Sequence, residues 1–232
     1  MEPFKVDGVE YASLGEAITA AAAEGGAIRL LSNAGNEGVS VAENSNFVLD
    51  LNGHTLDLTG PGAGSSGTET QGLQLLKGSE VVIKNGTIIF SDDPRLKMGI
   101  QNYCNLTLDN VKISGGSNIT YVVSNNYGNV VFKNKTTITA AEGRVAFDCW
   151  YGMSSVYDDP GVFITVADNS VKINGKVEFG KAGRASEENF AQHASITCPE
   201  EMELDVTLLN TPCEWTHNAS DSTKTLRYVY NA

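Results

Sequence analysis

Apolar and polar residues alternate in short runs, and one such run recurs along the chain. Each copy has two apolar residues separated by one position, then one further position and a turn residue. Another apolar residue comes three places after the turn residue. The clearest copies place Asn85, Asn110 and Asn134 at the turn. Strict alternation indicates a strand with one buried face, and Asn tolerates the left-handed backbone of a sharp bend. We therefore predict short strands joined at Asn bends.

The spacing of these bends predicts the architecture. Asn85 and Asn110 are 25 residues apart, and Asn110 and Asn134 are 24 apart. Looser copies surround Gly53 and Asn174. A repeat of 20–30 residues built on strands is typical of a β-solenoid. We predict an all-β, single-stranded right-handed parallel β-helix in which Asn85, Asn110 and Asn134 stack as a ladder of amide hydrogen bonds.

The two ends of the chain depart from the repeat. Ser13 to Glu16 reads as a capping box, which predicts a helix over about residues 13–24 that covers the first coil. We assign residues 1–180 to the β-helix with this N-terminal cap. Residues 181–232 are expected to form a C-terminal cap or terminal coils, with a hairpin whose tip lies at residues 218–222.

Composition narrows the classes of partner. The 232 residues are 41% hydrophobic and 19% charged, and the net charge is −12. An acidic chain repels phosphate backbones and anionic lipid surfaces, so we expect no nucleic-acid or membrane partner. The sequence shows no signal-peptide pattern and no apolar run long enough to span a bilayer. We expect synthesis in the cytoplasm.

Several segments are similar to one known superfamily. Residues 4–11 and 13–18 resemble the opening of pectate-lyase-like β-helix proteins, and residues 49–56 and 82–88 resemble their coils. The resemblance covers roughly residues 4–180. It implies the right-handed parallel β-helix fold. The superfamily includes polysaccharide lyases and hydrolases, adhesins, and phage tailspike, head-fibre and decoration proteins, so fold alone does not select a function.

Candidate catalytic chemistry is sparse. The acid pairs Asp92-Asp93 and Asp158-Asp159 both lie beside a proline, which favours solvated turns over a catalytic or metal-binding role. The spacing of the three histidines and four cysteines matches no metal site, and the cysteines read as buried free thiols. We predict no catalytic residues, no metal and no cofactor.

Aromatic residues supply the candidate binding site. Trp150, Tyr151 and Tyr157 lie in a stretch, residues 141–161, that reads as an insertion between repeats. Consecutive Trp150 and Tyr151 cannot both face the core of a regular strand. An exposed ring could stack on a sugar or a protein partner. The alternative is that these rings pack the inserted loop onto the body of the protein.

These observations favour a non-enzymatic virion protein of the capsid-decoration or head-fibre type, displayed on a phage particle. Its expected partners are capsid or other virion proteins, further copies of itself, for example in a trimer, and a host-surface glycan. Two alternatives stay open. One is a carbohydrate-binding adhesin, and the other is a polysaccharide lyase or hydrolase.

Overall fold

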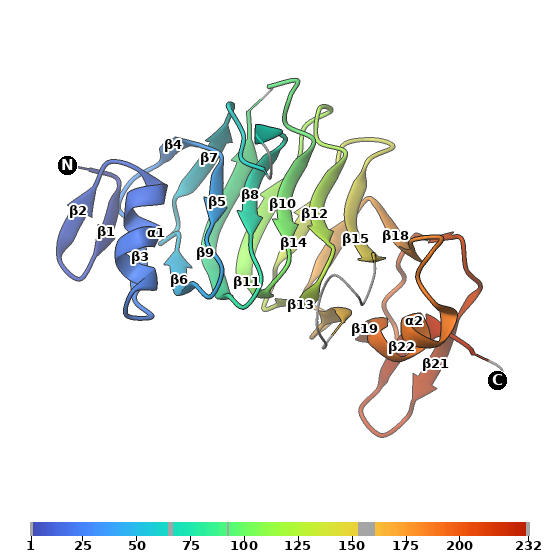
Figure 1. The fold of residues 1–232 in the computed structure, drawn as a ribbon. Helices are drawn as coiled ribbons and strands as arrows, with labels where there is room; N and C mark the ends of the chain where they lie inside the picture. The colour runs from blue at the N-terminus through green and yellow to red at the C-terminus, as the bar shows by residue number, and fades with distance from the viewer. Residues whose placement is uncertain (1, 65–66, 92, 153–160, 231–232) are drawn as a thin grey trace.

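The computed structural model describes residues 2–64, 67–91, 93–152 and 161–230. Within these residues the protein is all-β, with two short helices and two large sheets that run side by side along the molecule (Figure 1). Helix α1 (Leu14–Ala22) lies at the N-terminal end. A hairpin of β21 (Cys213–Asn218) and β22 (Thr223–Tyr228) lies at the C-terminal end.

The first sheet is built on a row of parallel strands from successive parts of the chain. This row consists of β3 (Ala27–Leu30), β6 (Asn46–Asp50), β9 (Glu80–Phe90), β11 (Asn105–Ser114), β13 (Gly128–Lys133), β16 (Val162–Val166) and β19 (Ala194–Pro199). A second row of parallel pairs continues it through β4 (Ala34–Glu37), β7 (Thr55–Thr59), β14 (Thr137–Thr139) and β17 (Lys172–Asn174). Antiparallel pairs occur at the two ends. At the N-terminal end, β1 (Phe4–Val6) pairs with β2 (Val9–Tyr11) and with β3.

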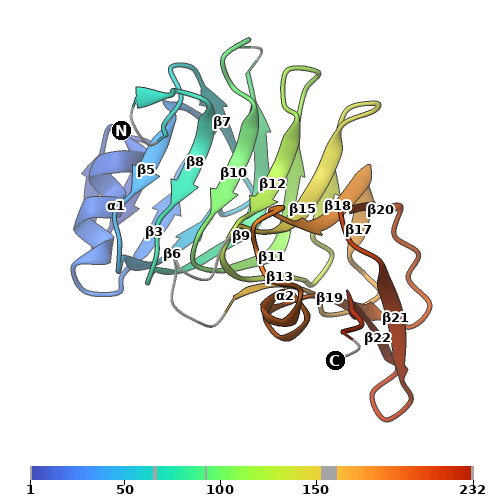
Figure 2. The same ribbon diagram turned by 45° about the vertical axis from the view of Figure 1, so that its right-hand side comes forward.

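The second sheet is entirely parallel and contains seven strands in the described residues. In spatial order they are β5 (Val39–Val41), β8 (Gln71–Leu75), β10 (Met98–Asn102), β12 (Tyr121–Asn125), β15 (Val145–Tyr151), β18 (Lys176–Lys181) and β20 (Val206–Leu209). Figure 2 shows them following one another along one side of the molecule. The chain passes alternately from one sheet to the other.

Asn bends divide the long strands of the first sheet. Asn85 has φ 59° and Asn110 has φ 52°, the left-handed conformation that Asn adopts more readily than most residues. Before Asn85, β9 pairs with β6; after it, β9 pairs with β7. One bent strand therefore serves both rows of the sheet.

The core lies between the two sheets. Alternate residues of β9 and β11 point inward, and Val81, Ile83, Leu106 and Leu108 are nearly fully buried. Strands of the second sheet are buried on both sides, so no simple alternation marks them in the sequence. Phe132 of β13 meets Phe147 of β15 with ring centroids 5.3 Å apart, which joins the two sheets.

The predicted N-terminal helix is confirmed, and so is its capping box. Ser13 accepts a hydrogen bond from the Glu16 backbone N–H, and the Glu16 side chain accepts one from the Ser13 N–H. The buried face of α1 consists of Leu14, Ala17, Ile18 and Ala21. It packs against β1, β3, β5 and β6 at the end of the molecule.

The C-terminal segment continues both sheets before it ends. Helix α2 (Glu187–His193) precedes β19, which extends the first sheet, and β20 extends the second. The predicted hairpin is confirmed, because β21 and β22 pair antiparallel from Cys213–Tyr228 to Asn218–Thr223. Strand β22 also pairs antiparallel with β19.

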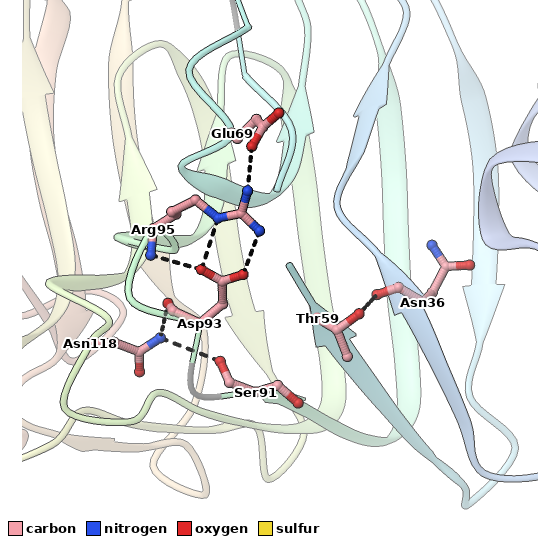
Figure 3. Close-up of polar contacts among 7 residues, drawn as sticks. All are labelled: Asn36, Thr59, Glu69, Ser91, Asp93, Arg95 and Asn118. Atoms are coloured by element: carbon pink, nitrogen blue, oxygen red, sulfur yellow. Dashed lines mark hydrogen bonds and ion pairs between the residues drawn. The ribbon is translucent and has the colours of Figure 1, made fainter. Parts of the chain in front are cut away.

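Polar contacts join successive loops at one edge of the molecule (Figure 3). Arg95 donates to both carboxylate oxygens of Asp93 and to Glu69. The Asn118 amide donates to the carbonyl groups of Ser91 and Asp93. These contacts therefore connect three loops, which lie between β7 and β8, between β9 and β10, and between β11 and β12.

Candidate functional site

A groove of about 510 Å³ lies on the outer face of the second sheet. It crosses the strands from β10 to β20. The described residues that line it are Met98, Tyr103, Tyr121, Ser124, Asn126, Asp148, Trp150, Gly152, Glu178 and Leu209. Three aromatic rings, two carboxylates and several uncharged polar groups therefore share one concave surface.

A row of polar residues runs along this face, one from each successive strand. In register order it consists of Gln74, Gln101, Ser124, Asp148 and Glu178. Their sequence neighbours on either side belong mainly to the apolar core. Gln74 Nε2 donates to Gln101 Oε1 over 3.2 Å, and Gln101 Nε2 donates to the Tyr103 hydroxyl over 3.0 Å. These bonds hold the polar side chains in fixed positions.

Asp148 is the most deeply buried carboxyl group of the groove, at 8% exposure. Its Oδ1 accepts a 2.8 Å hydrogen bond from the Asn125 backbone N–H. Burial raises the pKa of Asp148 to about 7, although the bonds from Ser124 and Asn125 act in the opposite direction. The negative charge of Glu178 raises the pKa further. Asp148 therefore exchanges its proton near neutral pH.

Glu178 lies opposite Asp148 on the adjacent parallel strand. Its Oε2 accepts a 3.1 Å hydrogen bond from the hydroxyl of Tyr121. Partial burial and the nearby Glu178 charge raise the pKa of Tyr121 to about 12. The phenol thus remains a proton donor throughout the neutral range.

The predicted aromatic residues separate into different environments. Trp150 is half-buried and lines the groove, whereas Tyr151 is 3% exposed and its ring lies 5.9 Å from that of Phe190. The alternation of a strand produces this division, as expected for consecutive residues. The interpretation of residues 141–161 as an insertion is wrong for Val145–Tyr151, which form the sheet strand β15. Tyr157 lies outside the described residues.

Of the three predicted ladder residues, Asn85 and Asn110 are joined by an amide hydrogen bond and Asn134 is not. Asn85, Asn110 and Asn134 all have positive φ, at 59°, 52° and 52°. The Asn110 amide donates to Asn85 Oδ1 over 3.1 Å, but the Asn134 amide donates to Asp109 instead. The proposed copy at Asn174 is wrong, because Asn174 pairs with Thr139 inside a strand. Asp168 follows β16, the strand that pairs with β13, and it accepts a hydrogen bond from the Asn134 backbone N–H.

The remaining candidate groups have structural surroundings. Asp93 forms the ion pair with Arg95, which lowers the pKa of this carboxyl to about 2. Asp92, Asp158 and Asp159 lie outside the described residues. The four cysteines are unpaired thiols, three of them buried, and burial raises the pKa of Cys104 to about 12 and of Cys198 to about 11. The described part of the chain contains no group of three or more His, Cys, Asp or Glu side chains placed to hold a metal ion.

Sequence reasoning missed the groove, although the chain carries a signal for it. The signal is a second repeat, in which an apolar residue, a polar residue and a residue buried in the interior follow one another. Its copies are Leu73-Gln74-Leu75, Ile100-Gln101-Asn102, Val123-Ser124-Asn125, Phe147-Asp148-Cys149 and Val177-Glu178-Phe179.

Comparison of the chain with protein-family models, with curated proteins and with solved structures gave no match. Among the described residues, neither helix has the length and apolar character needed to cross a bilayer.

Proposed function

We propose that this chain is a glycan-binding protein and that its two sheets are the faces of a right-handed parallel β-helix. The alternation of the chain between the sheets supports the β-helix, because each strand pairs in parallel with the corresponding strand of the next repeat. In such a rod the groove runs along the stack of coils. It therefore fits a linear polymer better than a compact ligand.

The observation that carries this function is the combination of Trp150 with the polar row in one groove. Sugar rings present an apolar face that stacks on aromatic rings and a rim of hydroxyl groups that needs hydrogen-bond partners. Trp150 and Tyr103 offer ring surfaces, and Asn126, Asp148 and Glu178 offer polar atoms around them. The hydrogen bonds within the row order these groups before a ligand arrives, which reduces the entropy lost on binding.

The charge of the groove selects among glycans. Its described lining residues include two carboxylates and no Lys or Arg side chain. Acidic polysaccharides would be repelled, and the net charge of −12 adds to that repulsion. The ligand is thus a neutral glycan or one that contains free amino sugars.

The location of the protein stays a prediction. A glycan-binding groove would serve a protein mounted on a phage particle, as the sequence suggests, and equally a cell-surface adhesin. Detection of the chain in purified virions by mass spectrometry would separate the two.

Tryptophan fluorescence offers a direct test, because the chain has only Trp150 and Trp215. A Trp215→Phe background isolates the Trp150 signal. An array of neutral, amino-sugar and acidic glycans first identifies a ligand, and a fluorescence titration in this background shows whether it binds at Trp150. Isothermal titration calorimetry then measures the affinity of each alanine variant, because Trp150→Ala has lost the fluorescent reporter. Trp150→Ala should weaken binding at least 10-fold, whereas Trp215→Ala should leave it unchanged, because Trp215 is not among the described residues that line the groove. Equal affinity of the two alanine variants, or preference for acidic glycans, would refute the proposal.

A further inference from the structure

The two ends of the second sheet differ. At the N-terminal end, helix α1 packs against the first strand of the sheet, β5. At the C-terminal end β20 is the last strand, and no described strand pairs with its outer edge (Figure 2). An unpaired strand edge is a template on which another strand can be added.

The hydrogen-bonding groups of this edge follow from the strand register. The Val177 N–H of β18 donates to the Asp205 carbonyl over 2.8 Å. In a parallel pair the bonded residues alternate along each strand, so the odd-numbered residues from Asp205 onward bond to β18. The N–H and C=O groups of Leu208 therefore point away from β18, towards the free edge.

The Leu208 side chain belongs to the core-facing row but is not covered. It lies in register with Phe179, which is fully buried, whereas Leu208 itself is 40% exposed. The first sheet continues beyond β19 with β22 and β21, whose residues Leu226 and Trp215 are in register with the buried Ile196. A position for one more strand is therefore left beside β20, opposite core-facing residues of the hairpin.

The charge around this position is negative. Residues 200–214 contain five acidic residues and no Lys or Arg. Glu203 and Asp205, which lie just before β20, are exposed. Lys176 is close to Asp205 in the register of β18, but the segment as a whole keeps a strong negative charge. A partner with cationic side chains fits this end of the molecule.

An added strand would extend two rows of side chains. Its inward residues would follow Leu208, where burial favours apolar side chains. Its outward residues would follow Thr207 and Glu178, which are register partners, and would lie among carboxylates that attract cations. Because side chains alternate along a strand, a segment in which apolar residues alternate with Lys or Arg satisfies both rows.

We propose that the free edge of β20 is a docking site for an extended segment of another protein, in which apolar residues alternate with Lys or Arg. The segment adds a strand to the second sheet, covers Leu208 and bonds to its free backbone groups. This site does not depend on the proposed glycan-binding function. Leu209 lines the glycan groove on the outer face, whereas Leu208 faces the core.

Fluorescence anisotropy tests the proposal with a labelled peptide of blocked ends, Gly-Lys-Val-Lys-Val-Lys-Val-Gly. A peptide with the three lysines and the three valines in separate blocks is the control for simple charge attraction, and it should bind about 10-fold more weakly or worse. Leu208→Thr should weaken binding of the alternating peptide by about 10-fold or more, because an apolar contact is lost. Leu208→Ile and Trp150→Ala should both bind it as the wild type does.

Backbone methylation distinguishes strand addition from other contacts. N-methylation of the three valines blocks one edge of the peptide, and N-methylation of the three lysines blocks the other. Loss of binding with methylated valines alone indicates an antiparallel strand, and loss with methylated lysines alone indicates a parallel one. Leu208→Pro removes the free N–H of β20 but none of its bonds to β18, so it should also weaken binding.

Three results would overturn the inference: binding no tighter than that of the block peptide, equal affinity of Leu208→Thr and the wild type, or the same response to both methylated peptides. Circular dichroism and melting temperature show whether Leu208→Pro is folded, and if it is not, Leu208→Thr and the methylated peptides still decide the matter. Failure here leaves the glycan titrations untouched, because those depend on Trp150 in the groove.

Discussion

The hydroxyl of Tyr121 donates a 3.1 Å hydrogen bond to Glu178 Oε2, although β15 lies between their two strands. The phenol therefore extends across the strand that carries Asp148. Three consecutive strands contribute to one polar cluster through this contact. Because the pKa of Tyr121 is raised to about 12, the hydroxyl keeps its proton under ordinary conditions.

Replacing Tyr121 by Phe should remove this bond with little change in shape. A typical side-chain hydrogen bond contributes about 1 kcal/mol to stability. Urea denaturation should show a loss of that size in the free energy of unfolding. Tyr228→Phe is the matched control, because Tyr228 makes the same type of bond to Glu187 at an exposed position and should cost less. Equal losses in both variants would contradict the prediction.

Asp148 should make stability depend on pH. Its pKa is about 7 in the folded protein against an ordinary value of 3.8, so the folded state holds the proton more tightly than the unfolded chain. The free energy of unfolding therefore falls as pH rises from about 4 to about 7, by up to ~4 kcal/mol. Asp148→Asn removes this cost. It should match the wild type near pH 4 and be more stable than the wild type at pH 8 in denaturant titrations.

Asp93 provides a control of opposite sign. Arg95 lowers the pKa of Asp93 to about 2, so its contribution to stability is present above about pH 4 and is lost as pH falls toward 2. Asp93→Asn should lower the melting temperature at pH 6 more than at pH 2.5. A wild-type-minus-variant difference that does not change with pH for either residue would contradict these assignments.

The elements that could be predicted from the sequence are those with a local signal. The capping box at Ser13 and Glu16 and the alternation around Val81 and Ile83 depend on neighbouring residues only. Asn bends were recognisable because few other residues adopt their backbone conformation. The register of β9, β11 and β13 follows from the nearly equal spacing of these bends, which is 25 and then 24 residues.

The groove could not be predicted in the same way because its residues are distant in the sequence. Tyr121, Asp148 and Glu178 meet only when three repeats are stacked in register. Strands such as β12 and β15 are buried on both sides, which hides the alternation that marks a half-exposed strand. Asp148 therefore resembled an irregularity within an apolar run. Aligning the second repeat on its apolar residues would have placed it on the outer face.

The Asn bends allow backbone strain to be measured separately from hydrogen bonding. Asn110 has φ 52° and donates to Asn85. Asn110→Gly loses the bond but keeps an unstrained backbone, whereas Asn110→Ala loses the bond and adds ~1–2 kcal/mol of strain. Asn129→Ala is the control, because Asn129 donates the same kind of amide bond to Asn105 and is not among the residues with positive φ. Thermal denaturation should rank the alanine at 110 as the most destabilising, and a smaller loss for it than for the glycine would refute the strain argument.

Phe132 and Phe147 should couple the two sheets energetically. Both side chains are fully buried, and their centroids are 5.3 Å apart across the interface between the sheets. Each change to Ala should cost ~3–5 kcal/mol, because it removes a buried ring and leaves a cavity. Leu is the milder substitution that keeps the protein folded if the alanine variants do not fold. In a double-mutant cycle with Leu at both positions, the two losses should differ from additivity by ~0.5–1.5 kcal/mol, the value of an aromatic pair. Strict additivity would mean that the rings fill space independently, and the contact between the sheets would then owe its stability to the surrounding aliphatic residues.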